Sequence, residues 1–241
     1  VNGLKEVAKM IFEKQNMTIS YTGKEEAPEF MKAEVESFIE GLYEYQKQGE
    51  KVKVTCIKSN EGFATAGGVQ YVACAGNFKD AGLEYTGALK VLQMIFSYEY
   101  LWIQIRVKGG AYGCMCSFSD QGDSMFVTYR DPNLAESYKV YDEAADYVAD
   151  FDADDRDMKK YIIGTIGSMD MPMEAVDMGA RSFHAYFLGK TEADLQKVRD
   201  QVLSCTQEDI RALAPIVKAV VEAGNRCCIG NEEKIDQNKE Y

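Results

Sequence analysis

The feature that most limits the fold of this chain is its most apolar segment, at residues 83–106. Its apolar side chains recur at helical spacing and leave few polar faces: Leu89, Leu92, Ile95, Phe96, Tyr100, Leu101, Ile103 and Ile105. A helix that is apolar on nearly every side must be buried. The rest of the chain is therefore expected to form layers around this helix, which Gly109-Gly110 would end.

Strand and helix patterns are unevenly distributed along the rest of the chain. Alternation of apolar and polar residues predicts strands at 17–22, 52–57, 69–75, 112–118, 124–130 and 226–229. Helical spacing predicts helices at 4–15, 29–47, from 131 onward, and at 154–168, 174–188, 192–204 and 207–222. Residues 60–68 are predicted to be a loop, and Asp120-Gln121-Gly122-Asp123 predicts a hairpin turn.

Several helix boundaries carry capping signals. Asp131 is expected to cap a helix whose first turn contains Pro132. Thr191 and Thr206 each stand three residues before an aspartate, which is the pattern of an N-cap with an acidic third residue. Gly189 is suited to the position just after a helix end.

Strands dominate the first half of the chain and helices the second, without regular alternation. This order favours an α+β fold over a doubly wound one. We expect a mixed, mostly antiparallel sheet of about six strands covered by helices.

No linker rich in proline or serine divides the chain, so residues 1–241 are predicted to form one domain. Val1 and the apolar positions directly after it suggest that residues 1–15 belong either to this domain or to a preceding linker or domain of a larger protein.

The charge and composition of the chain exclude several functions. Its 27 basic and 39 acidic side chains give a formal charge of −12, which argues against a nucleic-acid partner because phosphate binding needs a positive surface. Its apolar stretches are shorter than the roughly 20 residues that a membrane span requires, so no membrane partner is expected. The single histidine cannot supply a histidine-rich zinc site.

The seven cysteines are scattered and form no CxxC pair, which predicts reduced structural thiols in a reducing compartment. The expected location is therefore cytoplasmic, or an organellar matrix if the source is eukaryotic. Taken together, these observations predict no metal site and no cofactor-binding site in this chain.

Three local patterns resemble functional motifs only at first sight. His184 has no second histidine at metal-ligand spacing and is expected to be an ordinary helical residue. The acidic run 150–157 lacks the glycine and glutamate of a calcium loop and better fits a helix N-terminus. Gly109-Gly110-Ala111-Tyr112-Gly113 follows a helix and precedes a strand, whereas a phosphate loop needs the reverse order.

Arg106 and Tyr112 are the remaining candidates for chemistry. They flank the glycine turn, so an arginine at a helix end and a tyrosine entering a strand could point into one cleft. Such a pair can hold a peptide carbonyl or stabilise an oxyanion through hydrogen bonds. The alternative is that the arginine satisfies helix carbonyls and the tyrosine lies at a sheet edge.

A resemblance to a known family bears on this pair. The segment Ile105-Arg106-Val107-Lys108-Gly109-Gly110-Ala111-Tyr112-Gly113 is similar to one in the C-terminal half of presequence proteases, which are zinc metallopeptidases of the pitrilysin/insulinase family. Further similar segments follow in the same order along the chain: 68–72, 97–102, 129–133, 160–165 and 230–235. The chain thus resembles the last of the four related α+β domains of these enzymes.

The resemblance implies a role for this chain within a larger enzyme. In such peptidases the N-terminal half carries the H-x-x-E-H zinc motif, and the C-terminal half contributes an arginine and a tyrosine to the substrate. Arg106 and Tyr112 match those two positions, as residues that would hold the substrate backbone and donate to the developing oxyanion. The zinc motif is absent from this sequence, so the chain is expected to be inactive alone, with zinc held in the full-length parent.

Two functions follow from the resemblance. In the first, the chain is the substrate-clamping part of a zinc metalloendopeptidase that degrades short unfolded peptides, and its partners are the N-terminal catalytic half and the peptide. In the second, it is a non-catalytic structural or chamber-forming domain of the same family. Retention of both Arg106 and Tyr112 favours the first.

Overall fold

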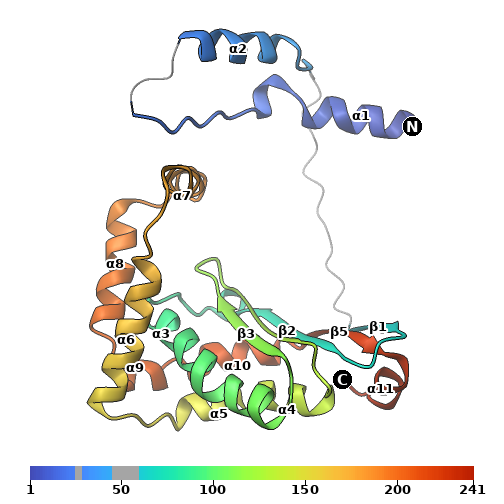
Figure 1. The fold of residues 1–241 in the computed structure, drawn as a ribbon, viewed down its shortest axis with the longest axis vertical. Helices are drawn as coiled ribbons and strands as arrows, with labels where there is room; N and C mark the ends of the chain where they lie inside the picture. Colours follow the sequence, from blue (N-terminus) through green and yellow to red (C-terminus); the bar gives the residue numbers. More distant parts are fainter. Residues whose placement is uncertain (25–28, 45–59) are drawn as a thin grey trace. The chain divides into compact units, whose positions relative to one another are not determined.

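The computed structural model describes residues 1–24, 29–44 and 60–241 of the chain (Figure 1). These residues belong to two compact units. The first consists of Val1–Cys56 together with Pro172–Thr191, and the second of Ile57–Met171 together with Glu192–Tyr241. That residues 1–241 form one domain stays a prediction.

The second unit contains a mixed sheet, which the described residues form from five strands in the order β1-β5-β2-β4-β3. The strands are β1 (Glu61–Thr65), β2 (Tyr71–Asn77), β3 (Gly113–Phe118), β4 (Asp123–Tyr129) and β5 (Asn225–Asn231). Strands β1 and β5 are parallel, and the other neighbours are antiparallel. The predicted mixed, mostly antiparallel α+β sheet is confirmed, with five described strands rather than about six.

One face of this sheet is covered by helices, as Figure 1 shows. The helices are α3 (Ala88–Ile95), α4 (Ala135–Asp142), α5 (Ala144–Ala149) and α10 (Ala214–Glu222). Side chains from alternate strand positions meet them in the core, among them Val72, Cys74, Cys116 and Phe126. Helix α10 approaches β2 so closely that a Cβ on Gly76 would lie 2.5 Å from the carbonyl oxygen of Val220.

The apolar segment that dominates the sequence is helical and mostly buried, as predicted, but Ile103, which was expected in the core, is exposed, and the helix starts later than Leu83. The helical geometry also changes along the segment. It begins at Ala88 as α3 and continues as two π-helical stretches, η3 (Phe96–Tyr100) and η4 (Trp102–Lys108). The helix ends at the predicted glycines, where Gly110 has a φ of +80°. Widened π-helical turns are rare and are often found at functional sites.

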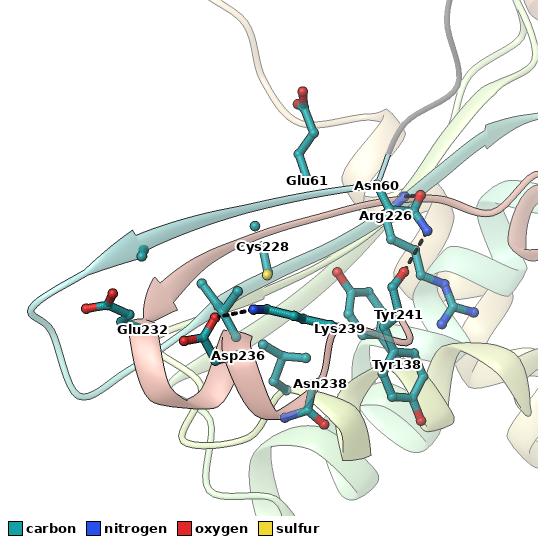
Figure 2. A pocket seen from close by; sticks show the side chains of 14 residues that line it. Asn60, Glu61, Tyr138, Arg226, Cys228, Glu232, Asp236, Asn238, Lys239 and Tyr241 are labelled. Atoms are coloured by element: carbon teal, nitrogen blue, oxygen red, sulfur yellow. Dashed lines mark hydrogen bonds and ion pairs between the residues drawn. The ribbon is translucent and has the colours of Figure 1, made fainter.

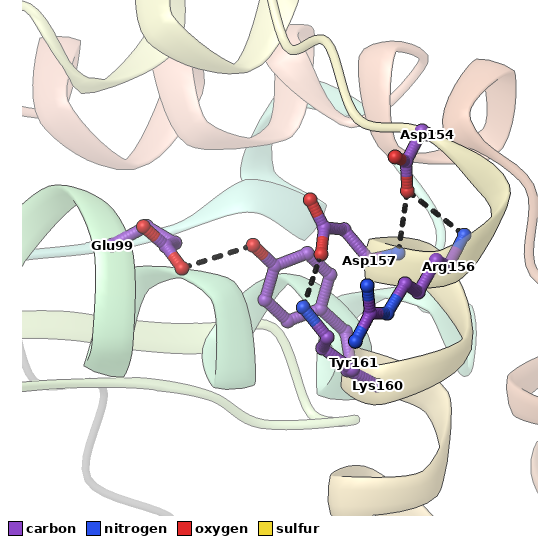
Figure 3. Close-up of polar contacts among 6 residues, drawn as sticks. All are labelled: Glu99, Asp154, Arg156, Asp157, Lys160 and Tyr161. Atoms are coloured by element: carbon purple, nitrogen blue, oxygen red, sulfur yellow. Dashed lines mark hydrogen bonds and ion pairs between the residues drawn. The ribbon is translucent and has the colours of Figure 1, made fainter.

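Three further helices belong to this unit: α6 (Asp155–Met169), α8 (Glu192–Leu203) and α9 (Gln207–Arg211). Figure 3 shows the start of α6, where the Asp154 carboxylate accepts hydrogen bonds from the backbone N–H groups of Arg156 and Asp157. The acidic run is therefore a helix N-terminus, as predicted. The Tyr161 hydroxyl donates to Glu99 over 3.1 Å and ties α6 to η3.

The first unit contains α1 (Asn2–Ile11), the short 3₁₀ turn η1 (Lys14–Asn16), α2 (Glu29–Glu40) and α7 (Ala175–Phe187). His184 lies on α7 and is exposed. Gly189 follows α7 with a φ of +63°, the left-handed conformation expected just after a helix end. No helix in the described ranges is long and apolar enough to cross a membrane.

Several boundaries predicted from the sequence are wrong. Residues 17–22 are extended but pair with no strand in the described part of the chain, and the predicted loop at 60–68 contains β1. The helix expected from Asp131 starts instead at Ala135, and the one expected at 207–222 is interrupted between α9 and α10. The predicted strand at 52–57 lies outside the described residues.

Strand pairing explains two of these departures, because alternation and capping signals are local while the pairing of β1 with β5 and of Asp131 with Gln70 is not. Two smaller elements complete the second unit: η2 (Phe78–Ala81), a 3₁₀ turn after β2, and α11 (Glu232–Gln237), which follows β5.

Candidate functional site

Arg106 lies in the last turn of η4, directly before the glycine turn. Its guanidinium carbon stands 4.2 Å from the ring centre of Trp102, one helical turn earlier. One guanidinium nitrogen, Nη1, donates a 2.7 Å hydrogen bond to the carbonyl oxygen of Tyr112. The side chain is thus held by a stacking partner on one side and a backbone acceptor on the other, which fixes the planar fork.

Tyr112 lies directly before β3, and its side chain is 63% exposed. The tyrosine ring makes an edge contact with Tyr129, with ring centres 5.7 Å apart, and the Arg106 guanidinium stands 5.6 Å from its centre. No hydrogen bond joins the Tyr112 hydroxyl to any described residue. The backbone of this tyrosine is therefore fixed while its hydroxyl remains available as a donor.

The exposed rings around Tyr112 belong to the side of the sheet opposite the core helices. We call this side the open face, and it is formed by exposed side chains from all five strands: Phe63, Tyr71, Met115, Met125, Tyr129 and Ile229. The strand registers place these residues in common rows, for example Phe63 beside Ile229 and Ile229 beside Tyr71. Tyr112 adjoins the open face through its ring contact with Tyr129, and Arg106 contacts Tyr112 from the end of η4.

The structure therefore brings together the two residues that the sequence singled out. It also adds Trp102 and Tyr129, which the sequence analysis missed. Trp102 precedes Arg106 by four residues, and side chains at that spacing share one side of a helix, so this contact could have been found. The position of Tyr129 beside Tyr112 depends on the pairing of β3 with β4 and on the turn after β4.

Cys114, a cysteine near the pair, is a weakly reactive thiol. Burial raises the pKa of the Cys114 thiol to about 11, although the positive charge of nearby Arg106 acts in the opposite direction. At neutral pH this thiol is protonated, so it supplies neither a thiolate nucleophile nor a thiolate ligand.

A separate cavity of about 350 Å³ lies between β1, β5 and α11 (Figure 2). The Arg226 guanidinium stands over the rings of Tyr138 and Tyr241, at 4.9 and 5.2 Å from their centres, and pairs with Asp142. Neither Arg106 nor Tyr112 lines this cavity. Its wall combines acidic and basic groups, including an ion pair between Asp236 and Lys239, and so favours no single ligand charge.

Zinc, which the resemblance assigns to the parent enzyme, was tested against the residues of this chain. In the described ranges no group of three or more His, Cys, Asp or Glu side chains is arranged to hold a metal ion. The six described cysteines are all free thiols, and the one histidine lies exposed on α7. The described residues do not fit a zinc site.

The fold is shared with peptidase domains of known structure. It is similar to a peptidase M16 inactive domain from Pseudomonas fluorescens, with a TM-score of 0.56, 14% identity, and coverage of 85% of this chain and 51% of that chain. It is also similar to pitrilysin, with a TM-score of 0.52, 12% identity, and coverage of 95% of this chain and 30% of that chain. Likenesses at these identities define the fold: an α+β domain of the type found in M16 peptidases.

The family follows from the sequence itself. Residues 60–231 match the family described as the PreP C-terminal domain. The chain therefore belongs to this family, the C-terminal domain of pitrilysin-type peptidases, and the resemblance seen in the sequence is confirmed.

Two curated relatives show how much of a longer protein the chain represents. Protein HypA of Clostridium perfringens is 42% identical over 239 residues, which is 99% of this chain and 25% of the relative. Presequence protease 1, chloroplastic/mitochondrial, of Arabidopsis thaliana is 34% identical over 178 residues, or 73% of this chain and 16% of the relative. The chain spans about a quarter or less of the length of these relatives.

Proposed function

We propose that this chain is the substrate-binding C-terminal part of a zinc-dependent peptidase that cleaves short unfolded peptides. The observation that carries the proposal is the pairing of Arg106 with Tyr112, which adjoins the open face, with the tyrosine hydroxyl free to donate. The family, and its presequence protease relatives, support a peptidase as the whole protein.

Each residue of the pair has a distinct task in this proposal. The Arg106 fork uses Nη1 for Tyr112, and its remaining N–H groups can donate to a backbone carbonyl of a bound peptide. The Tyr112 hydroxyl donates to the oxygen that becomes negative as the scissile carbonyl is attacked. One such donor typically contributes about 10²–10³-fold to kcat.

The open face provides binding area next to this pair. Its aromatic and methionine side chains offer apolar contacts to an extended peptide, and methionine adapts to different side-chain shapes. A folded protein buries most of its own apolar side chains, so this surface favours unfolded segments.

The zinc and its general base are assigned to the other half of the parent, since the residues described here do not form a metal site. The proposed partners are that N-terminal half and the peptide. Some relatives are mitochondrial or chloroplast presequence proteases, while Protein HypA is from a bacterium, so we propose a reducing compartment, either cytoplasm or organellar matrix.

One observation favours the alternative, a structural domain without a catalytic role. Arg106 already has a stacking partner and a backbone acceptor within this chain, so a packing role alone would satisfy its guanidinium. The two functions differ in what happens to a peptide when the chain joins the rest of its protein.

A cleavage assay separates them. An unstructured peptide is incubated with this chain, with the remaining part of the full-length protein, and with both together, and the products are quantified. The clamping function predicts cleavage only by the combination, and strong loss when the added chain carries Arg106→Ala. Equal loss with Tyr98→Phe, an exposed tyrosine of η3 that has no described hydrogen bond or ring contact with the pair, would contradict it, as would full activity of the remaining part alone.

A further inference from the structure

The turn that follows β4 contains an extra residue. Ala73 of β2 pairs with Val127, but Gln70 pairs with Asp131, so three steps along one strand face four along the other. Arg130 lies within this bulge and has a φ of +48°, which is unusual for a residue other than glycine. Tyr129 and Arg130 are consequently both exposed. Bulges of this kind re-aim side chains and are frequent beside functional sites.

A buried carboxylate anchors the bulge. Asp131 is 0% exposed, and its backbone exchanges two hydrogen bonds with Gln70, of 2.7 and 2.8 Å. Its Oδ1 accepts the backbone N–H of Asn133 at 2.9 Å, and its Oδ2 accepts the hydroxyl of Ser137 at 2.6 Å. A buried carboxylate is costly unless it is hydrogen-bonded, so both donors are needed to keep the turn in this form.

The turn held by Asp131 forms hydrogen bonds with both ends of the glycine turn of the candidate site, residues 109–112. The side-chain amide of Asn133 donates to the carbonyl oxygen of Gly109 over 2.6 Å. The carbonyl oxygen of Arg130 accepts the backbone N–H of Tyr112 over 3.2 Å. Residues 109–112 are therefore held between η4, which carries Arg106, and the bulge.

We infer that Asn133 is a positioning residue for Arg106 and Tyr112, and that Asp131 sets the conformation from which Asn133 acts. This inference rests on the proposed function for its kinetic consequence. Asn133 holds Gly109, and Gly109 begins the turn that orients Tyr112. Misplacement of a catalytic group by about 1 Å can cost about 10²-fold in rate, so even a small release of the turn is measurable.

Asn133→Asp is the most direct variant, because it keeps the size of the side chain and removes the N–H donor that Gly109 receives. Asn225→Asp is the matched control. Asn225 also donates from its side-chain amide to a backbone carbonyl, that of Ala75, at 3.1 Å, but on β5 and away from the pair. Asp131→Asn is less informative. The Asp131 carboxylate is buried and both of its oxygens accept hydrogen bonds, so its replacement is expected to affect folding itself.

The kinetic test is a double-mutant cycle in the full-length protein with an unstructured peptide as substrate. Asn133→Asp is expected to lower kcat about tenfold or more, with a smaller change in KM, because it disturbs a group that acts in the transition state. In a Tyr112→Phe background the same substitution should have little further effect, since the group that it positions is already gone. Equal losses in both backgrounds, or no loss in either, would overturn the inference.

A second readout does not need activity. Trp102 is the one tryptophan of the chain and is stacked against Arg106, so its fluorescence reports on the geometry of the pair. In the full chain, Asn133→Asp should shift Trp102 emission to longer wavelength and increase its quenching by acrylamide, while Asn225→Asp leaves both unchanged. An unchanged spectrum for Asn133→Asp would overturn the positioning role. If the spectrum shifts but Tyr112→Phe leaves turnover intact, the proposed function fails and the positioning stands.

Discussion

The guanidinium of Arg106 donates to the backbone carbonyl of Tyr112 over 2.7 Å, and this bond joins the end of a helix to the start of a strand across a glycine turn. The Tyr112 ring is exposed, and its hydroxyl forms no hydrogen bond with the part of the chain that the structure describes. A donor whose backbone is fixed before substrate arrives loses little entropy on binding, which is the condition for stabilising a developing charge.

Replacement of Arg106 should separate binding from stability. Arg106→Ala in the full-length protein is expected to raise KM and lower kcat for an unstructured peptide. Arg106→Lys should recover little, because a lysine cannot reproduce both the stacking on Trp102 and the forked hydrogen bonding. Peptide-cleavage kinetics and thermal melting are the measurements. A large fall in Tm for Arg106→Ala, with kinetics explained by the unfolded fraction, would support the packing role instead.

The buried thiols should react slowly. Burial raises the pKa of Cys74 and of Cys114 to about 11, from an ordinary value of 9.0. A rise of two units leaves about 100-fold less thiolate at pH 8, so alkylation by iodoacetamide should be slower than for a free thiol by about that factor. Peptide mapping after a timed reaction measures it. Labelling of Cys74 at the rate of a free thiol would show that β2 opens readily.

The same thiols predict a loss of stability at alkaline pH. Their pKa is higher in the folded than in the unfolded chain, so the unfolded state releases its protons first as the pH rises. Below about pH 9 these thiols should therefore leave the free energy of unfolding unchanged. As the pH rises from 9 through 11, the free energy of unfolding should fall. Urea titrations across this range test the sign. A free energy of unfolding that rises across it would contradict the assignment.

The capping box at the start of α9 gives a test of local stability. Thr206 Oγ1 accepts the backbone N–H of Asp209 at 3.1 Å, and the Asp209 carboxylate accepts the backbone N–H of Thr206 at 2.8 Å. Thr206→Ala should lower the free energy of unfolding by about 1 kcal/mol. Ser204→Ala removes one exposed hydroxyl, which donates to the carbonyl oxygen of Asp200, and leaves the box intact, so it should change the free energy of unfolding by less than about 0.5 kcal/mol. Equal effects of the two would argue against the box.

Metal analysis of the purified chain tests the assignment of zinc to the other half of the parent. We expect no stoichiometric zinc after dialysis, because the sequence has one histidine and the buried thiols are protonated at neutral pH. One zinc retained per chain would require ligands that include residues outside the described ranges, such as Cys56, and would contradict the expectation.

The sequence predicts those parts of this fold that depend on neighbouring residues. Helix α6 starts one residue after its predicted beginning, because Asp154 and the acidic first turn act locally. Strand β1 was missed because it contains Gly62 and is soon followed by Gly67-Gly68, and because its partner β5 lies near the other end of the chain, so no nearby pattern indicates the pairing. The π-helical turns of η3 and η4 leave the apolar spacing almost unchanged, and spacing alone does not reveal them.

The candidate site likewise combines features that local sequence predicts with features that depend on tertiary contacts. The approach of Arg106 to Tyr112 agrees with their spacing around a glycine turn, which the sequence offered as one of two alternatives. The contributions of Tyr129 and Asn133 depend on a bulge that arises from pairing between β2 and β4, and no local signal marks it. Asp131 was predicted to cap a helix and instead holds this bulge, which only the tertiary contacts with Gln70 and Ser137 explain.

The central claim, that the Tyr112 hydroxyl stabilises the transition state of peptide cleavage, is tested most directly by the single-turnover rate of Tyr112→Phe in the full-length protein. This change removes one oxygen and keeps the ring contact with Tyr129. The account predicts a rate lower by about 10²–10³-fold, with peptide affinity nearly unchanged. A single-turnover rate equal to that of the unmodified full-length protein, and to that of the matched control Tyr98→Phe, would contradict it.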